Sequence, residues 1–312
     1  MEIFVDGVEY ILNILEDDKF DDKKLKKYLS SKEGKLFLKH EKELRRKTNS
    51  LTIEEELRKV VEDENYKDPY EFYILKDNIE EVKKNLQFIK KNEDIIFENV
   101  LKQIYKYIPE SIKVDPNIVL YAGGVDGGFA IFTKNVYINF IKYIGNIDEF
   151  EKILAHEFYH ARQVPIGKKV TLILKMSFYP KKALYDTLGR LLEEGIASLV
   201  EHGTDFVRDD PVGTLTHREI LFYKEHFNIL NRALLSIKNE NPDYNLIYKI
   251  NVYVLGYIIS KTIYEREGIS ILNKWTVDFD YKTPIKKYIE ICKFEGKPSE
   301  FDMDLENWIM SM

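Results

Sequence analysis

HEFYH, residues 156–160, is the stretch that decides how this chain is interpreted. It matches H-E-x-x-H, in which two histidines four residues apart lie one above the other on a helix. His156 and His160 are therefore expected to bind one zinc ion together. Glu157 would project beside them, where it could take a proton from a zinc-activated water as a general base.

The flanking sequence predicts the helix that this motif requires. Asp148 followed by Glu151 is typical of an N-cap with its capping-box partner. Pro165 and Gly167 are expected to end the helix. The alternative is a solvated helix with two incidental histidines, which a chain with only six histidines makes less favoured. Apolar residues at spacings of three and four give a stripe for the core: Phe150, Ile153, Leu154, Phe158 and Ala161.

A catalytic zinc usually takes three protein ligands, so the chain should supply a third. The position six residues after His160, where a third histidine could follow, is occupied by Ile166. Further along, LLEEGIASLVEHG, residues 191–203, predicts a second amphipathic helix. Gly203 is the glycine expected at its C-terminal end.

Two glutamates of this second helix are candidates for the metal. Glu194 lies at the margin of the apolar stripe beside Gly195, whose small size permits a close helix approach, and it is the preferred third ligand. Glu193 is turned about 100° away and is expected at the surface. The alternative is that both are solvated helix charges.

Together the two motifs resemble those of the gluzincin metallopeptidases, the group that includes thermolysin. HEFYH followed by EEGIASLVE is similar to the aminopeptidase N family, whose second motif is N-E-G-F-A-S. In size the chain is closer to small bacterial gluzincin-like peptidases. The resemblance implies a zincin-type catalytic domain with Glu194 as third zinc ligand. It also implies a tyrosine in a Y-x-x-G motif that stabilises the oxyanion, matched by Tyr253 of Tyr253–Gly256; ordinary core packing is the alternative for Tyr253.

One signature of the aminopeptidases, G-A-M-E-N, is absent. In its place, residues 119–140 predict strand, glycine-rich turn, strand, turn and strand. The strand over residues 129–132 is expected to be a sheet edge that pairs with an extended peptide near the zinc. Asp126, the acid of the glycine-rich turn, is expected to be a turn residue.

The motifs predict a zinc metallopeptidase with one zinc per chain, acting on a peptide or protein substrate through a zinc-activated water. Two alternatives remain: a zinc hydrolase of a non-peptide substrate, and a non-catalytic binding protein that keeps the zincin fold. A structural zinc site favours cysteine ligands, and Cys292 is the single cysteine.

The rest of the chain predicts an α+β fold that is predominantly α. Residues 1–110 read as a helical N-terminal region, in which 77–107 form one long helix or two short ones. A small β-sheet should precede the H-E-x-x-H helix within a catalytic domain over residues 111–312. The apolar segment VTLILKMSFY, residues 170–179, is expected in the core, with a place along the substrate cleft as the alternative.

Composition bounds the setting of the protein. A net charge of −6 argues against general nucleic-acid binding. No run of 18 apolar residues indicates a membrane span. The first 15 residues lack the features of a signal peptide, and one cysteine suits a reducing compartment, so a cytoplasmic location is expected. No feature of the sequence indicates an oligomeric state.

Overall fold

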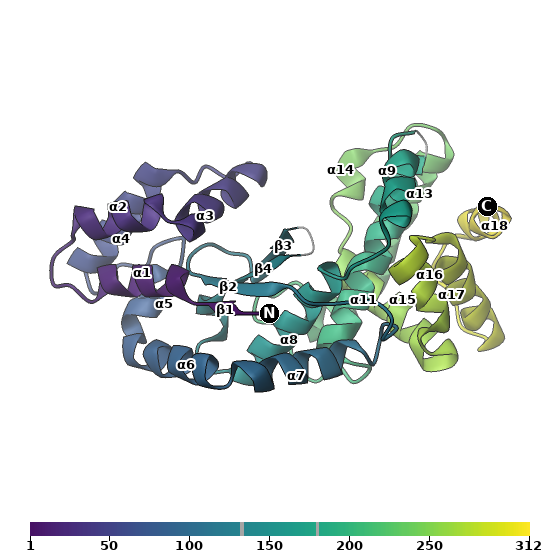
Figure 1. Ribbon diagram of the computed structural model, residues 1–312. Helices are drawn as coiled ribbons and strands as arrows, with labels where there is room; N and C mark the ends of the chain where they lie inside the picture. Colours follow the sequence, from purple (N-terminus) through teal and green to yellow (C-terminus); the bar gives the residue numbers. More distant parts are fainter. Residues whose placement is uncertain (132–133, 179–180) are drawn as a thin grey trace. The chain divides into compact units, whose positions relative to one another are not determined.

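The computed structural model describes residues 1–131, 134–178 and 181–312, and it is an α+β fold made mostly of helices (Figure 1). A helical N-terminal part comes first, and a small sheet precedes the helix that carries residues 156–160. The predicted fold class is thereby confirmed.

Contacts group the chain into two units. Unit 1 comprises Met1–Leu101 and Asp115–Ala161, and unit 2 comprises Lys102–Val114 and Arg162–Met312. The predicted boundary at residue 110 would separate two regions that fold independently. Because contacts do not measure independent folding, this boundary stays a prediction.

The helical N-terminal part has its elements where apolar residues recur at helical spacing. Residues 77–107 form two helices that part at Asn92, which settles the choice left by the sequence. The region around Pro69 separates two further helices. The helices are α1 (Asp6–Leu15), α2 (Asp22–Ser30), α3 (Lys32–Glu43), α4 (Ser50–Glu62), α5 (Phe72–Asp77), α6 (Ile79–Lys91) and α7 (Glu93–Ile104).

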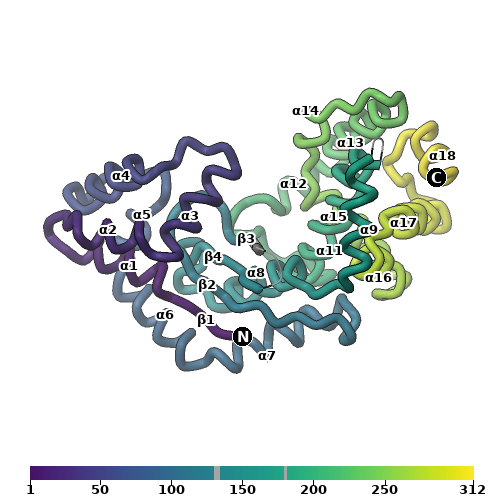
Figure 2. Tube along the Cα trace, turned by 45° about the horizontal axis from the view of Figure 1, so that its top comes forward, coloured from purple at the N-terminus to yellow at the C-terminus, as the bar shows by residue number. Residues whose placement is uncertain are grey.

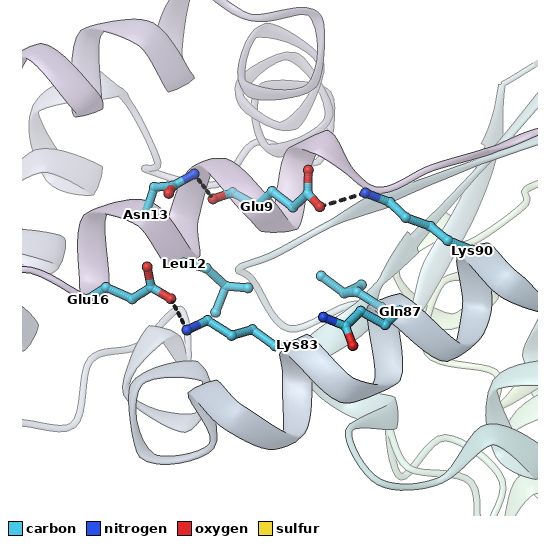
Figure 3. A pocket seen from close by; sticks show the side chains of 8 residues that line it. Glu9, Leu12, Asn13, Glu16, Lys83, Gln87 and Lys90 are labelled. Carbon is cyan, nitrogen blue, oxygen red and sulfur yellow. Dashed lines mark hydrogen bonds and ion pairs between the residues drawn. The ribbon is translucent and has the colours of Figure 1, made fainter.

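Ion pairs join α1 to α6 on the surface of unit 1. Lys83 lies 2.7 Å from Glu16, and Lys90 lies 2.7 Å from Glu9. These two pairs cross a small surface pocket of about 250 Å³ (Figure 3). Because the two glutamates and two lysines that line the pocket already form ion pairs with one another, we interpret the pocket as part of the contact between α1 and α6.

A four-stranded sheet lies in unit 1, in the order β1-β2-β4-β3. β1 and β2 are parallel, as are β2 and β4, whereas β3 is antiparallel to β4 and forms an edge. The three strands predicted within 119–140 are therefore confirmed, and β1 was not predicted. Phe132, the last residue expected in the edge strand, lies outside the described residues. The strands are β1 (Ile3–Phe4), β2 (Asn117–Tyr121), β3 (Gly128–Ile131) and β4 (Asn135–Asn139).

After the sheet, a 3₁₀ turn η1 (Phe140–Tyr143) leads into α8 (Ile147–His160), which packs against β3 and β4. Its N-cap is Asn146, whose side chain accepts a hydrogen bond from the Glu149 amide at 3.2 Å, so the predicted cap at Asp148 is wrong. An asparagine two residues earlier serves equally well as a cap and lengthens the helix.

The chain between the two motifs also departs from expectation. α8 ends at His160, Pro165 begins the next helix, and Gly167 lies inside that helix, α9 (Ile166–Met176). None of its residues is buried, so the expectation of a core position for residues 170–178 is wrong; Tyr179 lies outside the described residues.

Unit 2 is helical, and its centre is the contact between α11 and α15, which lie side by side in both views (Figure 1, Figure 2). Cys292, the single cysteine, is buried and free. In the described parts of the chain, no helix is both long and apolar enough to span a membrane. The remaining elements are α10 (Lys181–Leu184), the π-helical turn η2 (Tyr185–Gly189), α11 (Arg190–His202), α12 (His217–Leu221), α13 (Tyr223–Lys238), α14 (Tyr244–Ile247), α15 (Val252–Glu267), α16 (Ile269–Asp278), α17 (Lys282–Phe294) and α18 (Met303–Ser311).

Candidate metal centre and active site

The polar residues of the H-E-x-x-H motif face the protein interior. His156 and Glu157 are only 5% and 6% exposed, and His160 is half-buried at the end of α8. The rings of His156 and His160 have their centroids 5.0 Å apart, as expected for imidazoles one helical turn apart. Burying two imidazoles and a carboxylate is costly unless they are paired or bind a metal.

Glu157 lies beside the edge strand of the sheet. A Cβ atom built on Gly128, the first residue of β3, would lie 3.4 Å from Cγ of Glu157, so the backbone of β3 passes close to this side chain. The same Cβ would come within 2.9 Å of the Tyr137 carbonyl oxygen, which no side chain could tolerate. Gly128 therefore sets the close approach of β3 to its neighbours.

The turn before β3 is held by an ion-pair cluster. Asp126 accepts two hydrogen bonds from Arg46, at 2.6 and 2.8 Å, and lies 3.1 Å from Nε2 of His40. Burial alone would raise the pKa of the Asp126 carboxyl, but the hydrogen bonds from His40 and Arg46 outweigh it and hold that pKa well below its usual range. His40 also stacks on Phe129 of β3, with ring centroids 3.7 Å apart. Asp126 is thus a structural anion and more than a simple turn residue.

The second motif lies on α11, as predicted, and the helix ends at Gly203 with a φ of 70°. Its Gly195 is in backbone contact with Gly256 of α15: a Cβ atom on Gly195 would lie 2.2 Å from the Gly256 carbonyl oxygen. A Cβ atom on Gly256 would lie 2.1 Å from the Leu191 carbonyl oxygen. Only glycine fits at either position.

This helix crossing places two predicted site residues on neighbouring elements. Glu194 is next to Gly195, and Tyr253 is three residues before Gly256 on α15, which is the long helix that the sequence predicted. Both side chains are half-buried. The glycine-to-glycine contact therefore fixes the spacing between the two helices that carry Glu194 and Tyr253.

Glu193 is not the surface charge that the sequence suggested. Its carboxylate accepts two hydrogen bonds from the buried Arg162, at 2.8 and 2.9 Å, and one from Nε1 of Trp275 at 2.7 Å. Arg162 also donates from Nε to the Thr276 carbonyl oxygen at 3.1 Å. The expectation for Glu193 is wrong because the sequence shows no partner that could neutralise the charge.

The pair between Arg162 and Glu193 joins the two motif segments. Arg162 is two residues past His160, and Glu193 directly precedes Glu194. A bidentate guanidinium–carboxylate pair is directional, so within unit 2 it ties the segment that follows α8 to α11. A paired charge that joins positions 31 residues apart is a feature that neither motif reveals on its own.

Three of the predicted site residues come together. One ring nitrogen each of His156 and His160 and one carboxylate oxygen of Glu194 all lie within 4.8 Å of one another. Among the described residues, this is the one group of three or more His, Cys, Asp or Glu side chains so arranged. Two imidazoles and one carboxylate form a donor set typical of catalytic zinc sites, which keep a further position for water.

A buried pair further along α11 was not singled out from the sequence. Glu201 is buried, and its carboxylate lies 3.6 Å from Nε2 of His202. Glu201 follows Glu194 by seven residues, two helical turns, and so shares its side of α11. The seven-residue spacing between Glu194 and Glu201 is the sequence signal that could have predicted a second glutamate on this side of α11.

Comparisons with known proteins give one match. Residues 25–296 match a family model described as "Putative zinc dependent peptidase (DUF5700)". Searches of curated proteins and of solved structures find no match. Since the matched residues make up well over half of the chain, this protein belongs to that zinc peptidase family.

Proposed function

We propose that the protein hydrolyses peptide bonds as a gluzincin-type zinc peptidase. His156, His160 and Glu194 would hold the zinc, and Glu157 would act as the general base. The observation that carries this proposal is the approach of three donor atoms to within 4.8 Å, with a buried glutamate one residue after the first histidine. The family supports a zinc peptidase in general, and the arrangement of residues supports this particular type.

The side chains present fit a zinc ion. Nitrogen and oxygen donors from two histidines and a glutamate satisfy its preference for borderline ligands, and three protein ligands leave room for a water. A zinc ion bound there would lower the pKa of its water and polarise the substrate carbonyl. The protein would supply the donors from two elements: α8 carries both histidines, and α11, whose backbone contacts α15 at Gly195 and Gly256, carries Glu194.

Glu157 is suited to move the proton. Its side chain lies on α8 between the two histidines in sequence and is screened from bulk water. It would accept a proton from the attacking water and then deliver it to the departing amine nitrogen. A glutamine at this position would keep the shape and remove the base.

Tyr253 would donate a hydrogen bond from its phenol to the oxyanion that develops on the substrate carbonyl. The direct backbone contact between Gly195 and Gly256 supports this role, since it holds the tyrosine's helix against the helix of Glu194. The role predicts a larger loss of kcat than of substrate affinity when the phenol is removed, because the oxyanion exists only in the transition state.

The edge strand β3 would bind the substrate backbone. Its outer edge has no strand partner among the described residues, and its first residue adjoins Glu157. An extended peptide could add to this edge through main-chain hydrogen bonds. Asp126, whose carboxylate accepts hydrogen bonds from Arg46 and lies against Nε2 of His40, is not assigned to a substrate amine.

The test is cleavage of a fluorogenic peptide library by the purified protein. Hydrolysis of at least some members, abolished by a chelator and restored by zinc, is the expected result. Chelator-sensitive hydrolysis of simple esters without cleavage of any peptide would replace the proposal with a hydrolase of another substrate class. Full zinc occupancy without either activity would replace it with a binding protein.

A further inference from the structure

The helix between the two motif helices exposes its apolar face. Ile166, Val170, Ile173 and Leu174 are 81%, 49%, 64% and 57% exposed, and we call these four residues the α9 face. Their spacing of four, seven and eight residues places them on one side of α9. Phe178, just past the helix, is 64% exposed as well. Single exposed apolar residues are ordinary, whereas a contiguous stripe marks a surface that binds something.

The opposite side of α9 faces the protein. Leu172 and Met176 are half-buried there, and α9 contacts α10. Lys168, also on that side, forms an ion pair of 2.8 Å with Asp278 at the end of α16. The helix is therefore held to the protein through the side that carries Leu172, Met176 and Lys168, so the α9 face points outward.

The charge of this segment is the reverse of the chain's. Residues 163–185 contain five lysines and no acidic residue, in a protein whose net charge is −6. Lys169 flanks the α9 face on the helix, and Lys181 and Lys182 are exposed at the start of α10. Within the described part of the chain, these five lysines form one ion pair, between Lys168 and Asp278.

We propose that the α9 face docks on an anionic lipid surface. Apolar side chains would enter the boundary between headgroups and acyl chains, and the flanking lysines would bind the lipid phosphates and carboxylates. Clusters of four to eight basic residues are typical of anionic-lipid recognition, and the five lysines of this segment, three on α9 and two on α10, fall within that range. The helix would lie in the membrane plane, which suits its length of 11 residues.

A second copy of the chain suits this face less well. A stable dimer buries about 800 Å² on each partner, more than one side of three helical turns can offer. Two-fold symmetry would also set the lysines of one copy against those of the other. An acidic peptide could satisfy the lysines but would leave most of the apolar stripe exposed to water.

The experiment is flotation of the full-length protein with vesicles of phosphatidylcholine alone and of phosphatidylcholine mixed with phosphatidylserine. The expected result is binding to the mixed vesicles alone. The variant Ile173→Ser/Leu174→Ser should bind at least about tenfold more weakly. The variant Lys169→Gln/Lys181→Gln/Lys182→Gln should lose on the order of a hundredfold, since each lysine near an anionic surface contributes about fivefold.

Matched controls come from elsewhere on the surface. Leu221→Ser removes an apolar side chain that is equally exposed on α12, and Lys23→Gln/Lys26→Gln removes charge from α2; both should bind as the wild type does. Glu157→Gln should also bind normally, so the result is independent of the peptidase proposal.

Three outcomes would overturn the proposal. One is no binding to mixed vesicles, and another is binding that survives the two α9 variants. The third is evidence that the α9 face binds a protein and no vesicles. Such evidence would be a dimer in light scattering that Ile173→Ser/Leu174→Ser dissociates. It would also be an acidic peptide that binds the wild type but not the lysine variant.

Discussion

α8 and α9 are consecutive helices of 14 and 11 residues, and each has an apolar stripe, yet they have opposite environments. α8 is buried throughout Ile153–Tyr159, including its polar His156 and Glu157, whereas α9 buries none of its residues. Apolar periodicity shows which residues share a face, but it does not show what that face meets. The inversions, polar groups inside and apolar groups outside, mark the two places for which we propose functions.

The largest expected effect concerns the buried carboxylate of α8. Glu157→Gln should lower kcat for peptide cleavage by about 10²–10⁴-fold, because the general base is lost while the fold and the metal donors remain. Glu151→Gln makes the same change at a half-buried glutamate of α8 that accepts hydrogen bonds from Asn99, and it should leave kcat within about twofold. Equal activity of the Glu157→Gln and Glu151→Gln variants would show that Glu157 is not the general base.

A matched pair of phenylalanines measures the burial difference directly. Phe158→Ala on α8 should lower the free energy of unfolding by about 3–5 kcal/mol, since its side chain is fully buried. Phe178→Ala, just past α9, should change it by less than about 0.5 kcal/mol. Urea denaturation of both variants checks this. A large cost at Phe178 would mean that the α9 region is covered in solution.

The segment between the two helices has its own buried charge pair. Arg162→Met should cost about 2–4 kcal/mol, because it leaves the Glu193 carboxylate without its guanidinium partner. Adding Glu193→Gln should recover part of that cost, since the unpaired charge is then gone. A double-mutant cycle from denaturation midpoints measures the coupling, and additive single effects would argue against a shared role.

The smallest expected effect is a pH dependence of the free energy of unfolding, and it comes from Asp126 in the turn before β3 of the sheet that packs against α8. The pKa of Asp126 is lower in the folded protein than in the unfolded chain, so its stabilisation is present above about pH 4 and is lost as pH falls toward the folded value. Asp126→Asn should remove on the order of 1 kcal/mol at neutral pH and progressively less as pH falls below about 4. The exposed Asp18→Asn should show no such trend, and a difference that grows on acidification would contradict the assignment.

The sequence predicted what depends on local signals. The H-E-x-x-H helix, the helix that ends at Gly203, and the three strands near Asp126 each have a pattern contained within a few residues. Glu194 is predicted as the third ligand from its place at the margin of an apolar stripe and from the resemblance in motif order, and one of its carboxylate oxygens does lie within 4.8 Å of a ring nitrogen of each histidine.

Features that depend on distant partners could not be predicted. Glu193 is neutralised by Arg162, 31 residues away, and no spacing rule indicates such a pair. β1 pairs with β2 over more than 100 residues. The outward orientation of the α9 face depends on which neighbours cover each side, although the five lysines without an acidic residue were a sequence signal against burial.

Metal content gives the sharpest test of a zinc site formed by His156, His160 and Glu194. Protein purified without a chelator or histidine tag should contain about one zinc per chain by plasma mass spectrometry. His160→Ala and Glu194→Ala should each lose most of it, whereas His217→Ala, which removes an exposed histidine, should keep it. Zinc retained in Glu194→Ala, or absent from the wild type after incubation with zinc, would contradict the account.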